Sequence, residues 1–298
     1  MPCCFRPANC HSDSRTQEVT MSAKPYANLA LLTDLDGTLL TPEKTLSAED
    51  AAAIADFREK GGLFSFATGR SLQASQAYIA QLQPDFAVVL YNGALIYDPK
   101  TAQTTGETFL PAAAEPLIQE LMQQFPTAGA EVLCPEGIFT IQDNEYEREH
   151  LRVTNIPMIL RDFREIDTTS CYKALFADDP AVIDRMSRYA AAERFSAVSF
   201  TRSHKTFLEI LPLETNKGTA LRKLRAMLPE NVRIGATGDF DNDIAMLKTA
   251  DFCGCPADAQ DCVQNAVAAQ GGFRSSKTCA SGFFADWIHA FAQKYAAQ

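Results

Sequence analysis

Short apolar runs alternate with helical patterns from residue 29 onward, and this alternation constrains the fold more than any other feature of the chain. The apolar runs occupy 29–32, 63–67 and 86–90, and segments with helical periodicity separate them at 47–60 and 71–82. The runs lack polar alternation, as strands do when helices cover both faces of a parallel sheet. The sequence therefore predicts an α/β fold built on a doubly wound parallel sheet.

The first predicted helix has recognisable ends. Ser47 stands at its N-cap position with Asp50 three residues later, an acidic variant of the capping box. Gly61 and Gly62 follow the last helical residue, where a left-handed backbone costs glycine nothing.

A different pattern interrupts the alternation after a turn at residues 98–100. Helical segments expected at 112–125 and 180–194 mix here with β segments expected at 138–142, 172–176, 197–201 and 207–211. The alternation then resumes with helices at 217–227, 244–249 and 283–295, a strand at 232–236 and a short strand near Phe252. Because roughly a hundred residues can form an independent module, we expect a core domain of residues 25–97 and 209–298, with an inserted α/β domain at 98–208.

Composition and charge restrict the class of partner. The 298 residues leave room for two domains, and 46% of them are hydrophobic against 21% charged, as in a soluble globular protein. The 27 Lys and Arg against 37 Asp and Glu give a net charge of −10, which repels nucleic-acid phosphates and anionic lipid. No stretch reaches the roughly 18 apolar residues of a membrane span. We therefore expect neither nucleic acid nor membrane as a partner; the oligomeric state is not predicted.

The cysteines and the first residues indicate a cytoplasmic protein. Nine cysteines are an odd number and contain no C-x-x-C pair, so we expect reduced thiols. Residues 1–24 lack the apolar core of a signal peptide and are expected to be a disordered leader, with Met21 as a candidate natural start. A metal site of Cys3, Cys4, Cys10 and His11 is disfavoured because no second ligand pair follows.

Two acids spaced by one residue follow the first apolar run. Side chains alternate in extended backbone, so Asp34 and Asp36 are expected to project to the same side at the end of the strand. Two such carboxylates repel one another unless a cation or a proton neutralises them. The alternative is a β-hairpin at Asp36-Gly37, and this motif alone does not decide between the two interpretations.

Two further strand-to-helix junctions carry groups suited to an anion. Thr68 and Gly69 end the second apolar run, where a hydroxyl and an unencumbered N–H at a helix start can hold phosphate; a plain N-cap is the alternative. Lys217 opens a later helix, where its charge opposes the helix dipole unless the ammonium reaches an anion. A solvated surface lysine is the alternative here.

The fourth junction is acidic. Asp239 follows the strand expected at 232–236, and Asn242 and Asp243 stand three and four residues later, on one face of the first helical turn. A calcium loop of the EF-hand type is excluded, because Ile244 stands where glycine is needed and Ala250 where an acid is needed. Because the carboxyl ends of parallel strands meet at one edge, the four junctions should converge as a site for phosphoryl transfer with magnesium.

These motifs, together with Asn92-Gly93-Ala94 after the third apolar run, resemble those of the haloacid dehalogenase (HAD) superfamily. Within it the chain is similar to the Cof-type subfamily IIB phosphatases, from about residue 29 to the C-terminus. The resemblance implies a Rossmann-like, HAD-like core with an inserted α/β cap. Phe240 departs from the small residue that usually follows Gly-Asp in the family's last motif.

The resemblance also implies a mechanism. Asp34 would attack phosphorus to form an aspartyl-phosphate, and Asp36 would act as general acid and then base. Mg²⁺ would be held by the carboxylates of Asp34 and Asp239 and the backbone carbonyl of Asp36, with Asp243 supporting that shell. Four residues would bind the phosphoryl oxygens: Thr68, Gly69, Lys217 and Asn242.

The expected function is magnesium-dependent hydrolysis of small phosphorylated metabolites. By resemblance, sugar phosphates come first, ahead of pyridoxal phosphate and nucleotides, but no recognisable motif in the inserted domain specifies the substrate. His150, Arg148 and Arg152 are candidate contacts for an anionic substrate, although a solvated helix is the favoured interpretation. The alternatives are a phosphosugar mutase of the phosphomannomutase kind and a non-catalytic regulatory protein that binds a phosphorylated ligand.

Overall fold

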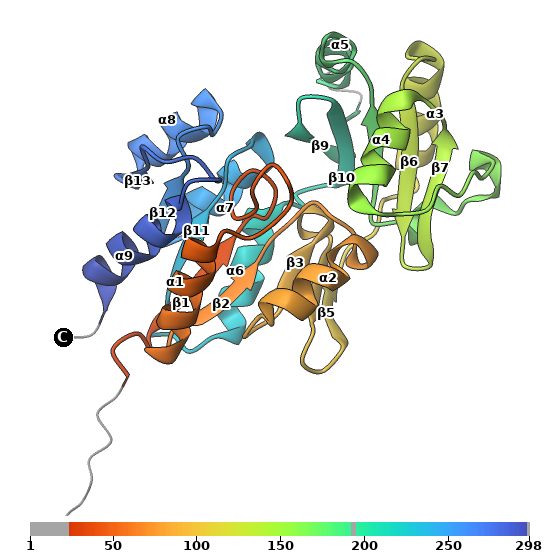
Figure 1. The fold of residues 1–298 in the computed structure, drawn as a ribbon. Helices are drawn as coiled ribbons and strands as arrows, with labels where there is room; N and C mark the ends of the chain where they lie inside the picture. Colours follow the sequence, from red (N-terminus) through yellow and green to blue (C-terminus); the bar gives the residue numbers. More distant parts are fainter. Residues whose placement is uncertain (1–23, 192–194, 297–298) are drawn as a thin grey trace, which may run out of the picture.

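The structure, a computed structural model, describes residues 24–191 and 195–296. Its core is a five-stranded sheet in the order β13-β12-β11-β1-β2, with every pairing parallel. The strands are β1 (Leu29–Thr33), β2 (Leu63–Phe66), β11 (Arg233–Thr237), β12 (Phe252–Cys255) and β13 (Phe273–Arg274). The predicted α/β fold with a parallel sheet is confirmed (Figure 1).

Helices cover both faces of this sheet. They are α1 (Ala48–Glu59), α2 (Leu72–Leu82), α6 (Lys217–Met227), α7 (Ile244–Thr249), α8 (Asp261–Ala269) and α9 (Phe283–Tyr295). Leu29 and Leu31 of β1 pack in one buried cluster with α1 and α9, whereas Ala30 and Leu32 pack in another with α6, α7 and α8. The apolar character of β1 from Leu29 to Leu32 follows from this double coverage.

The predicted ends of α1 are confirmed. The Ser47 hydroxyl oxygen accepts a hydrogen bond from the Asp50 N–H at 3.0 Å, and the hydroxyl donates to the Asp50 carboxylate at 2.7 Å. That buried carboxylate also accepts the N–H of Ala285 at 2.8 Å, which ties the start of α1 to α9. At the other end, Gly61 has a φ of 98°, which favours glycine.

The third apolar run does not extend the parallel sheet as expected. Strand β3 (Val88–Leu90) has one parallel bridge to the core, between Ala67 and Val89, and forms a three-stranded sheet with β4 (Leu95–Asp98) and β5 (Gln103–Glu107). The reason is a tight 3₁₀ turn at Tyr91–Gly93 in which all three residues have positive φ, so the chain reverses at once into β4.

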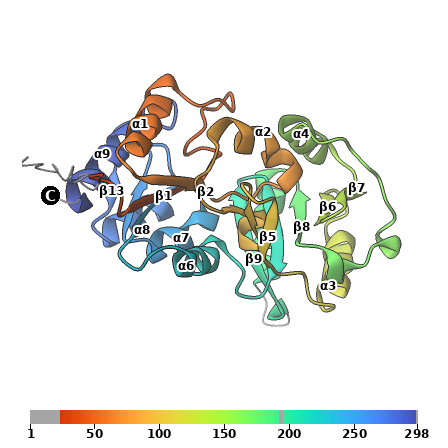
Figure 2. The ribbon, with the colours of Figure 1, turned by 90° about the horizontal axis from the view of Figure 1, so that it is seen from below.

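A second, antiparallel sheet lies in the inserted region, in the order β7-β6-β8-β10-β9. Its strands are β6 (Gly129–Cys134), β7 (Gly137–Gln142), β8 (Lys173–Ala177), β9 (Val198–His204) and β10 (Phe207–Pro212). Helices α3 (Ala114–Gln124) and α5 (Pro180–Ala190) share its buried cluster, and α4 (Glu145–Thr154) packs near β6 and β8 (Figure 2). Short 3₁₀ turns occur at Phe163–Glu165, Thr168–Ser170 and Asp241–Asp243.

Strand pairing indicates that the limits of the inserted unit differ from the predicted residues 98 and 208. Strand β5 still pairs with β4 as far as Glu107, and β10 pairs within the second sheet as far as Pro212. We therefore propose 108–113 and 213–216 as the two linkers between the core and this unit, called the cap below.

The expectation of reduced thiols is wrong for one pair of cysteines. Cys134, at the end of β6, forms a disulfide with Cys171, which lies two residues before the neighbouring strand β8. Among the described residues, Cys253, Cys255, Cys262 and Cys279 are free. Residues 1–23 of the predicted leader, with Cys3, Cys4, Cys10 and His11, lie outside the described residues.

Membrane-spanning helices were searched for separately. In residues 24–191 and 195–296, none of the helices has the length and apolar character needed to cross a bilayer.

Candidate active site

Three strands deliver their following residues to one edge of the core sheet. Thr33 at the end of β1 is in register with Phe66 of β2 and Thr237 of β11, and the Asp34 N–H donates to the Thr237 carbonyl at 3.0 Å. Because both pairings of β1 are parallel and the Asp36-Gly37 turn leads toward α1, the hairpin alternative is wrong.

Lys217 connects two of the predicted acids. Its Nζ lies 2.6 Å from Asp34 Oδ1 and 2.7 Å from Asp243 Oδ1, and its side chain is completely buried. Burial alone would lower the pKa of this ammonium, but the charges of Asp243 and Asp34 outweigh it and raise the pKa. The surface-lysine alternative is therefore wrong, and the ammonium reaches anions as the motif suggested.

An acidic cluster lies beside this lysine. Carboxylate oxygens of Asp34, Asp239 and Asp243 all lie within 4.8 Å of one another. The Asp243 carboxylate accepts the Asp239 N–H at 2.9 Å, and the Thr38 hydroxyl donates to Asp239 at 2.6 Å. Gly37 is required here, because a Cβ at this position would lie 2.5 Å from an Asp239 oxygen.

The donor set of this cluster fits a hard divalent cation. Burial raises the pKa of Asp34 to about 7, and the charges of Asp243 and Asp36 add to this effect. Burial also raises the pKa of Asp239, and the charge of Asp34 raises it further. Carboxylates crowded in this way, with only oxygen ligands, are suited to Mg²⁺. The cluster brings together the expected Asp34 and Asp239, and Asp243 contributes an oxygen where only a supporting role was expected.

The Asp36 carboxylate pairs with two cations that do not contact the acidic cluster through any hydrogen bond or ion pair described above. Arg70 donates to it from Nε at 2.6 Å and from Nη2 at 2.7 Å, and Lys44 Nζ lies 2.7 Å away. Burial would raise the pKa of Asp36, but the hydrogen bonds and charges of Arg70 and Lys44 lower it far below the usual range. Donation of a proton by Asp36 therefore requires these cations to be displaced. Arg70 follows the predicted Thr68-Gly69 directly in the chain, whereas no sequence signal indicated Lys44.

Three of the four residues expected to bind phosphate, Thr68, Gly69 and Asn242, lie together around Asn92. Thr68 is buried, its carbonyl accepts the Asn92 N–H at 3.0 Å, and the Asn242 amide donates to Asn92 Oδ1 at 2.9 Å. A Cβ at Gly69 would lie 3.1 Å from the Asn92 amide, so glycine permits this approach. The N-cap of α2 is Ser71, which accepts the Ala74 N–H, so Thr68 is not a plain N-cap.

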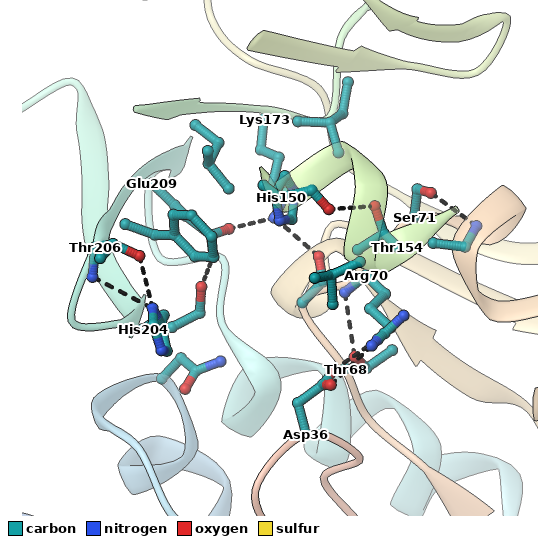
Figure 3. A pocket seen from close by; sticks show the side chains of 18 of the residues that line it. Asp36, Thr68, Arg70, Ser71, His150, Thr154, Lys173, His204, Thr206 and Glu209 are labelled. Carbon is teal, nitrogen blue, oxygen red and sulfur yellow. Dashed lines mark hydrogen bonds and ion pairs between the residues drawn. The ribbon is translucent and has the colours of Figure 1, made fainter. Parts of the chain in front are cut away.

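Two cap residues that sequence reasoning missed contact Gly69 and Asn92. Lys173 of β8 forms a buried ion pair with Glu209 of β10, and its Nζ donates to the Gly69 carbonyl at 2.8 Å (Figure 3). Glu209 in turn accepts the Asn92 side-chain amide at 2.9 Å. The sequence did contain one signal for this pair, because Glu209 is a charged residue inside an otherwise apolar strand. Charges are rarely buried without a partner, so Glu209 indicated that a cation lies nearby.

A cavity of about 450 Å³ lies between the core and the cap. Asp34, Asp36 and Asn242 line it from the core, whereas Lys173 and His150 line it from the cap (Figure 3). The predicted candidates Arg148 and Arg152 do not line it; they form exposed ion pairs with Asp143 and Glu149.

Comparisons with known proteins agree with this geometry. Residues 31–275 match the model of the haloacid dehalogenase-like hydrolases. The HMP-PP phosphatase of Escherichia coli O6:H1 is 28% identical over 221 residues, covering 72% of this chain and 78% of that protein. The 5-amino-6-(5-phospho-D-ribitylamino)uracil phosphatase of Bacillus subtilis is 27% identical over 246 residues, covering 79% and 86%.

A solved structure described as a HAD subclass IIB sugar phosphatase has the same fold. It superposes with a TM-score of 0.76 at 15% identity, covering 88% of this chain and 98% of that one. The match of the family model over most of the chain, with its motifs gathered at one cavity, shows that the chain belongs to the haloacid dehalogenase-like hydrolases.

Proposed function

We propose that the protein is a magnesium-dependent phosphatase that hydrolyses small phosphorylated metabolites through an aspartyl-phosphate on Asp34. The observation that carries this proposal is the position of the Asp34 carboxylate at the cavity, next to an acidic cluster and held by a buried ammonium. The two curated relatives described above are named as phosphatases of small phosphorylated compounds.

The chain's own residues account for the chemistry. Asp34 attacks phosphorus, which divides one difficult displacement into two easier ones. Lys217, Thr68, the Gly69 N–H and Asn242 bind the phosphoryl oxygens and stabilise their charge in the transition state. Asp36, once released by Arg70, protonates the leaving oxygen and later takes a proton from the attacking water.

Mg²⁺ would be held by Asp34 and Asp239, with Asp243 beside them and the backbone carbonyl of Asp36 as the further expected ligand. When bound, the ion supplies positive charge that offsets repulsion between the phosphate and these carboxylates.

The nucleophile is tested by Asp34→Asn. The amide cannot attack phosphorus, so we expect release of inorganic phosphate from p-nitrophenyl phosphate to fall by at least about 1,000-fold. Retained hydrolysis would show that Asp34 is not the nucleophile. With a hexose 1-phosphate as substrate, free phosphate indicates hydrolysis, whereas hexose 6-phosphate would indicate a mutase; a protein with neither activity would be a binding or regulatory protein.

The metal is tested by removing it and its ligand separately. We expect EDTA to abolish hydrolysis and added Mg²⁺ to restore it, because the acidic cluster then regains its counter-ion. Mg²⁺ should also raise the melting temperature of the wild-type protein but not of Asp239→Asn. An unchanged activity after chelation would rule out a metal-dependent reaction.

The absence of nucleic-acid and membrane partners remains a prediction from composition, and the net charge of −10 supports it by repelling polyanions. The cytoplasmic location remains a prediction from the cysteines and the first residues.

A further inference from the structure

Helix α4 forms one side of the cavity. Half of its residues line the cavity, namely Tyr146, Glu149, His150, Val153 and Thr154. A second face of the helix packs on the cap sheet, and the side chains of α4 that are buried there are those of Glu147 and Leu151. One of the two buried side chains that attach α4 to the sheet is therefore an acid.

This acid is buried against another one. Glu147 and Glu131 of β6 are both completely buried, and their carboxyl groups lie within hydrogen-bonding reach of each other. Gly129, the first residue of β6, permits this approach, because a Cβ there would lie 2.6 Å from the Cβ of Glu147. The two acids thus connect the helix directly to the sheet.

The oxygens of the two acids lack donors. Within residues 24–191 and 195–296, neither oxygen of Glu131 accepts a hydrogen bond, and Glu147 accepts only one, from the Thr140 hydroxyl at 3.5 Å. Two ionised carboxylates at this site would repel one another and would remain unsatisfied away from water. One shared proton removes both costs, because the protonated acid donates a hydrogen bond to the other.

The surrounding groups place this proton on Glu147. Burial and the charge of Glu131 raise the pKa of Glu147 to about 11, and the charge of Asp143, which precedes the N-cap of α4, adds to this effect. Two groups favour the negative charge on Glu131 instead. They are Lys173 of β8, through its charge, and His150, whose Nε2 lies 3.3 Å from Glu131 Oε1.

We propose that Glu147 is a positioning residue: as a neutral acid it donates a hydrogen bond to Glu131, and this bond holds α4 in place along the cavity. The N-cap residue Asn144 donates to the Ala177 carbonyl at 2.8 Å and fixes the start of the helix. The later turns, which carry most of the cavity residues, depend on Glu147 and Leu151. The consequence for substrate binding rests on the proposed function, whereas the attachment of α4 does not.

The proton makes the attachment of α4 dependent on pH. The pKa of Glu147 is raised while α4 lies on the sheet and returns to its ordinary value when the helix detaches and the side chain meets water. Between these two values detachment releases a proton, so its equilibrium constant should rise about tenfold per pH unit. The attachment is therefore strongest at low pH and weakens as the pH rises.

Amide hydrogen exchange of residues 145–154 measures this equilibrium. After correction for the intrinsic exchange rate, the protection of α4 in the wild-type protein should fall about tenfold per unit between about pH 6 and pH 9. Glu147→Gln stays neutral and keeps a donor, so its protection should not change with pH. Glu145→Gln makes the same change at an exposed position of α4 and is the matched control, with the wild-type dependence. Protection that is independent of pH in the wild type, or a dependence that survives Glu147→Gln, would overturn the proposal.

Steady-state kinetics separate positioning from a purely structural role. Glu147→Ala removes the donor, so α4 no longer closes the cavity around the nitrophenyl group of p-nitrophenyl phosphate. We expect its KM to rise by at least about fivefold and kcat to stay within about twofold of the wild type. Inhibition by inorganic phosphate, which has no leaving group to meet α4, should also stay within about twofold. A KM that does not change, or phosphate inhibition that weakens as much as KM rises, would contradict positioning through α4.

Rescue and folding complete the kinetic test. Glu147→Gln should restore the wild-type KM, because the amide donates to Glu131 in place of the acid. Thermal unfolding of each variant checks that the cap is folded. If Glu147→Ala does not fold, the exchange comparison with Glu147→Gln still decides the proposal.

The exchange measurement needs no activity, so this inference and the proposed function fail separately. If no ester is hydrolysed but the protection of α4 falls with pH only while Glu147 is present, the phosphatase proposal fails and the role of Glu147 stands. If p-nitrophenyl phosphate is hydrolysed but the protection of α4 is the same at every pH, the role of Glu147 fails and the proposed function stands.

Discussion

Lys217 is placed where an isolated lysine would be unfavourable. It is the first residue of α6, so its charge opposes the helix dipole, and it is completely removed from water. The contacts with Asp34 and Asp243 offset both costs. Because one of these two carboxylates is the proposed nucleophile, we expect the ammonium to contribute to the rate of hydrolysis as well as to the fold.

Lys217→Met tests this role. The variant loses a donor to the phosphoryl oxygens and leaves two carboxylates without their cation, so we expect kcat/KM to fall by at least about 100-fold. Steady-state hydrolysis of p-nitrophenyl phosphate provides the measurement. Lys223→Met, at an exposed position of the same helix, is the control and should stay within about twofold of the wild type. A decrease below about tenfold for Lys217→Met would show that the lysine is only structural.

At the residue scale, the sequence predicted the groups that follow a strand directly and missed those that depend on the cap. Asp34, Thr68 and Asp239 could be found because parallel strands deliver them to one edge. Lys173 and Glu209 could not be assigned, because nothing local in the sequence shows that they contact Gly69 and Asn92. Asp34 and Asp36 both line the cavity, as expected, but the sequence did not show that Arg70 and Lys44 pair with the Asp36 carboxylate.

At the scale of elements, two glycines determine how α9 packs. A Cβ at Gly254 of β12 would lie 2.2 Å from Trp287 Cδ1, and one at Gly235 of β11 would lie 2.9 Å from the same ring. Trp287 is completely buried. The helix can therefore lie directly on the sheet only because both strands lack a side chain there.

Gly254→Ala should consequently destabilise the core. The added methyl group forces the indole or the helix to move, and overpacking of this kind costs about 1 to 3 kcal/mol in the free energy of unfolding. Urea unfolding followed by tryptophan fluorescence measures the loss. Gly106→Ala is the control, because its Cβ would meet Ile96 at an ordinary 3.6 Å. Equal unfolding midpoints for the two variants would contradict this account of α9.

Three helices were predicted with the correct bounds, whereas β6, α4 and α8 were missed. The helices expected at 217–227, 244–249 and 283–295 have those bounds in the structure. Strand β6 and helix α4 were not predicted, and they contain the buried Glu131 and Glu147. A buried carboxyl counts as polar in a periodicity pattern, so the apolar side of such an element is hidden from sequence reasoning.

At the scale of the whole molecule, Lys173 and Glu209 join the cap to the residues that are expected to bind phosphate. Lys173 contacts Gly69 in the core, and Glu209 contacts Asn92, which in turn binds Asn242. The relative position of the two units is therefore coupled to the groups expected to hold phosphate. We therefore expect both residues to act as positioning residues.

Replacing both members of this pair, by Lys173→Met with Glu209→Leu, avoids leaving a single buried charge. We expect kcat/KM to fall by at least about tenfold and inhibition by inorganic phosphate to weaken in parallel, because Gly69 and Asn92 lose their contacts with the cap. Arg58→Met breaks an ion pair with Asp85 inside the core and is the control for lost stability. Unchanged phosphate inhibition in the double variant would show that the pair only stabilises the fold.

The parallel pairing of β1 with β11 has a consequence for biosynthesis. These strands are neighbours in the core sheet, yet the whole cap sheet, residues 129–212, lies between them in the chain. On the ribosome the cap sheet is therefore complete before β11 emerges, while β1 still has an unpaired edge. Asp34 and Lys217, which are 183 positions apart, meet only near the end of translation. The nascent chain consequently acquires the cap side of the cavity before it acquires the full set of residues proposed to react.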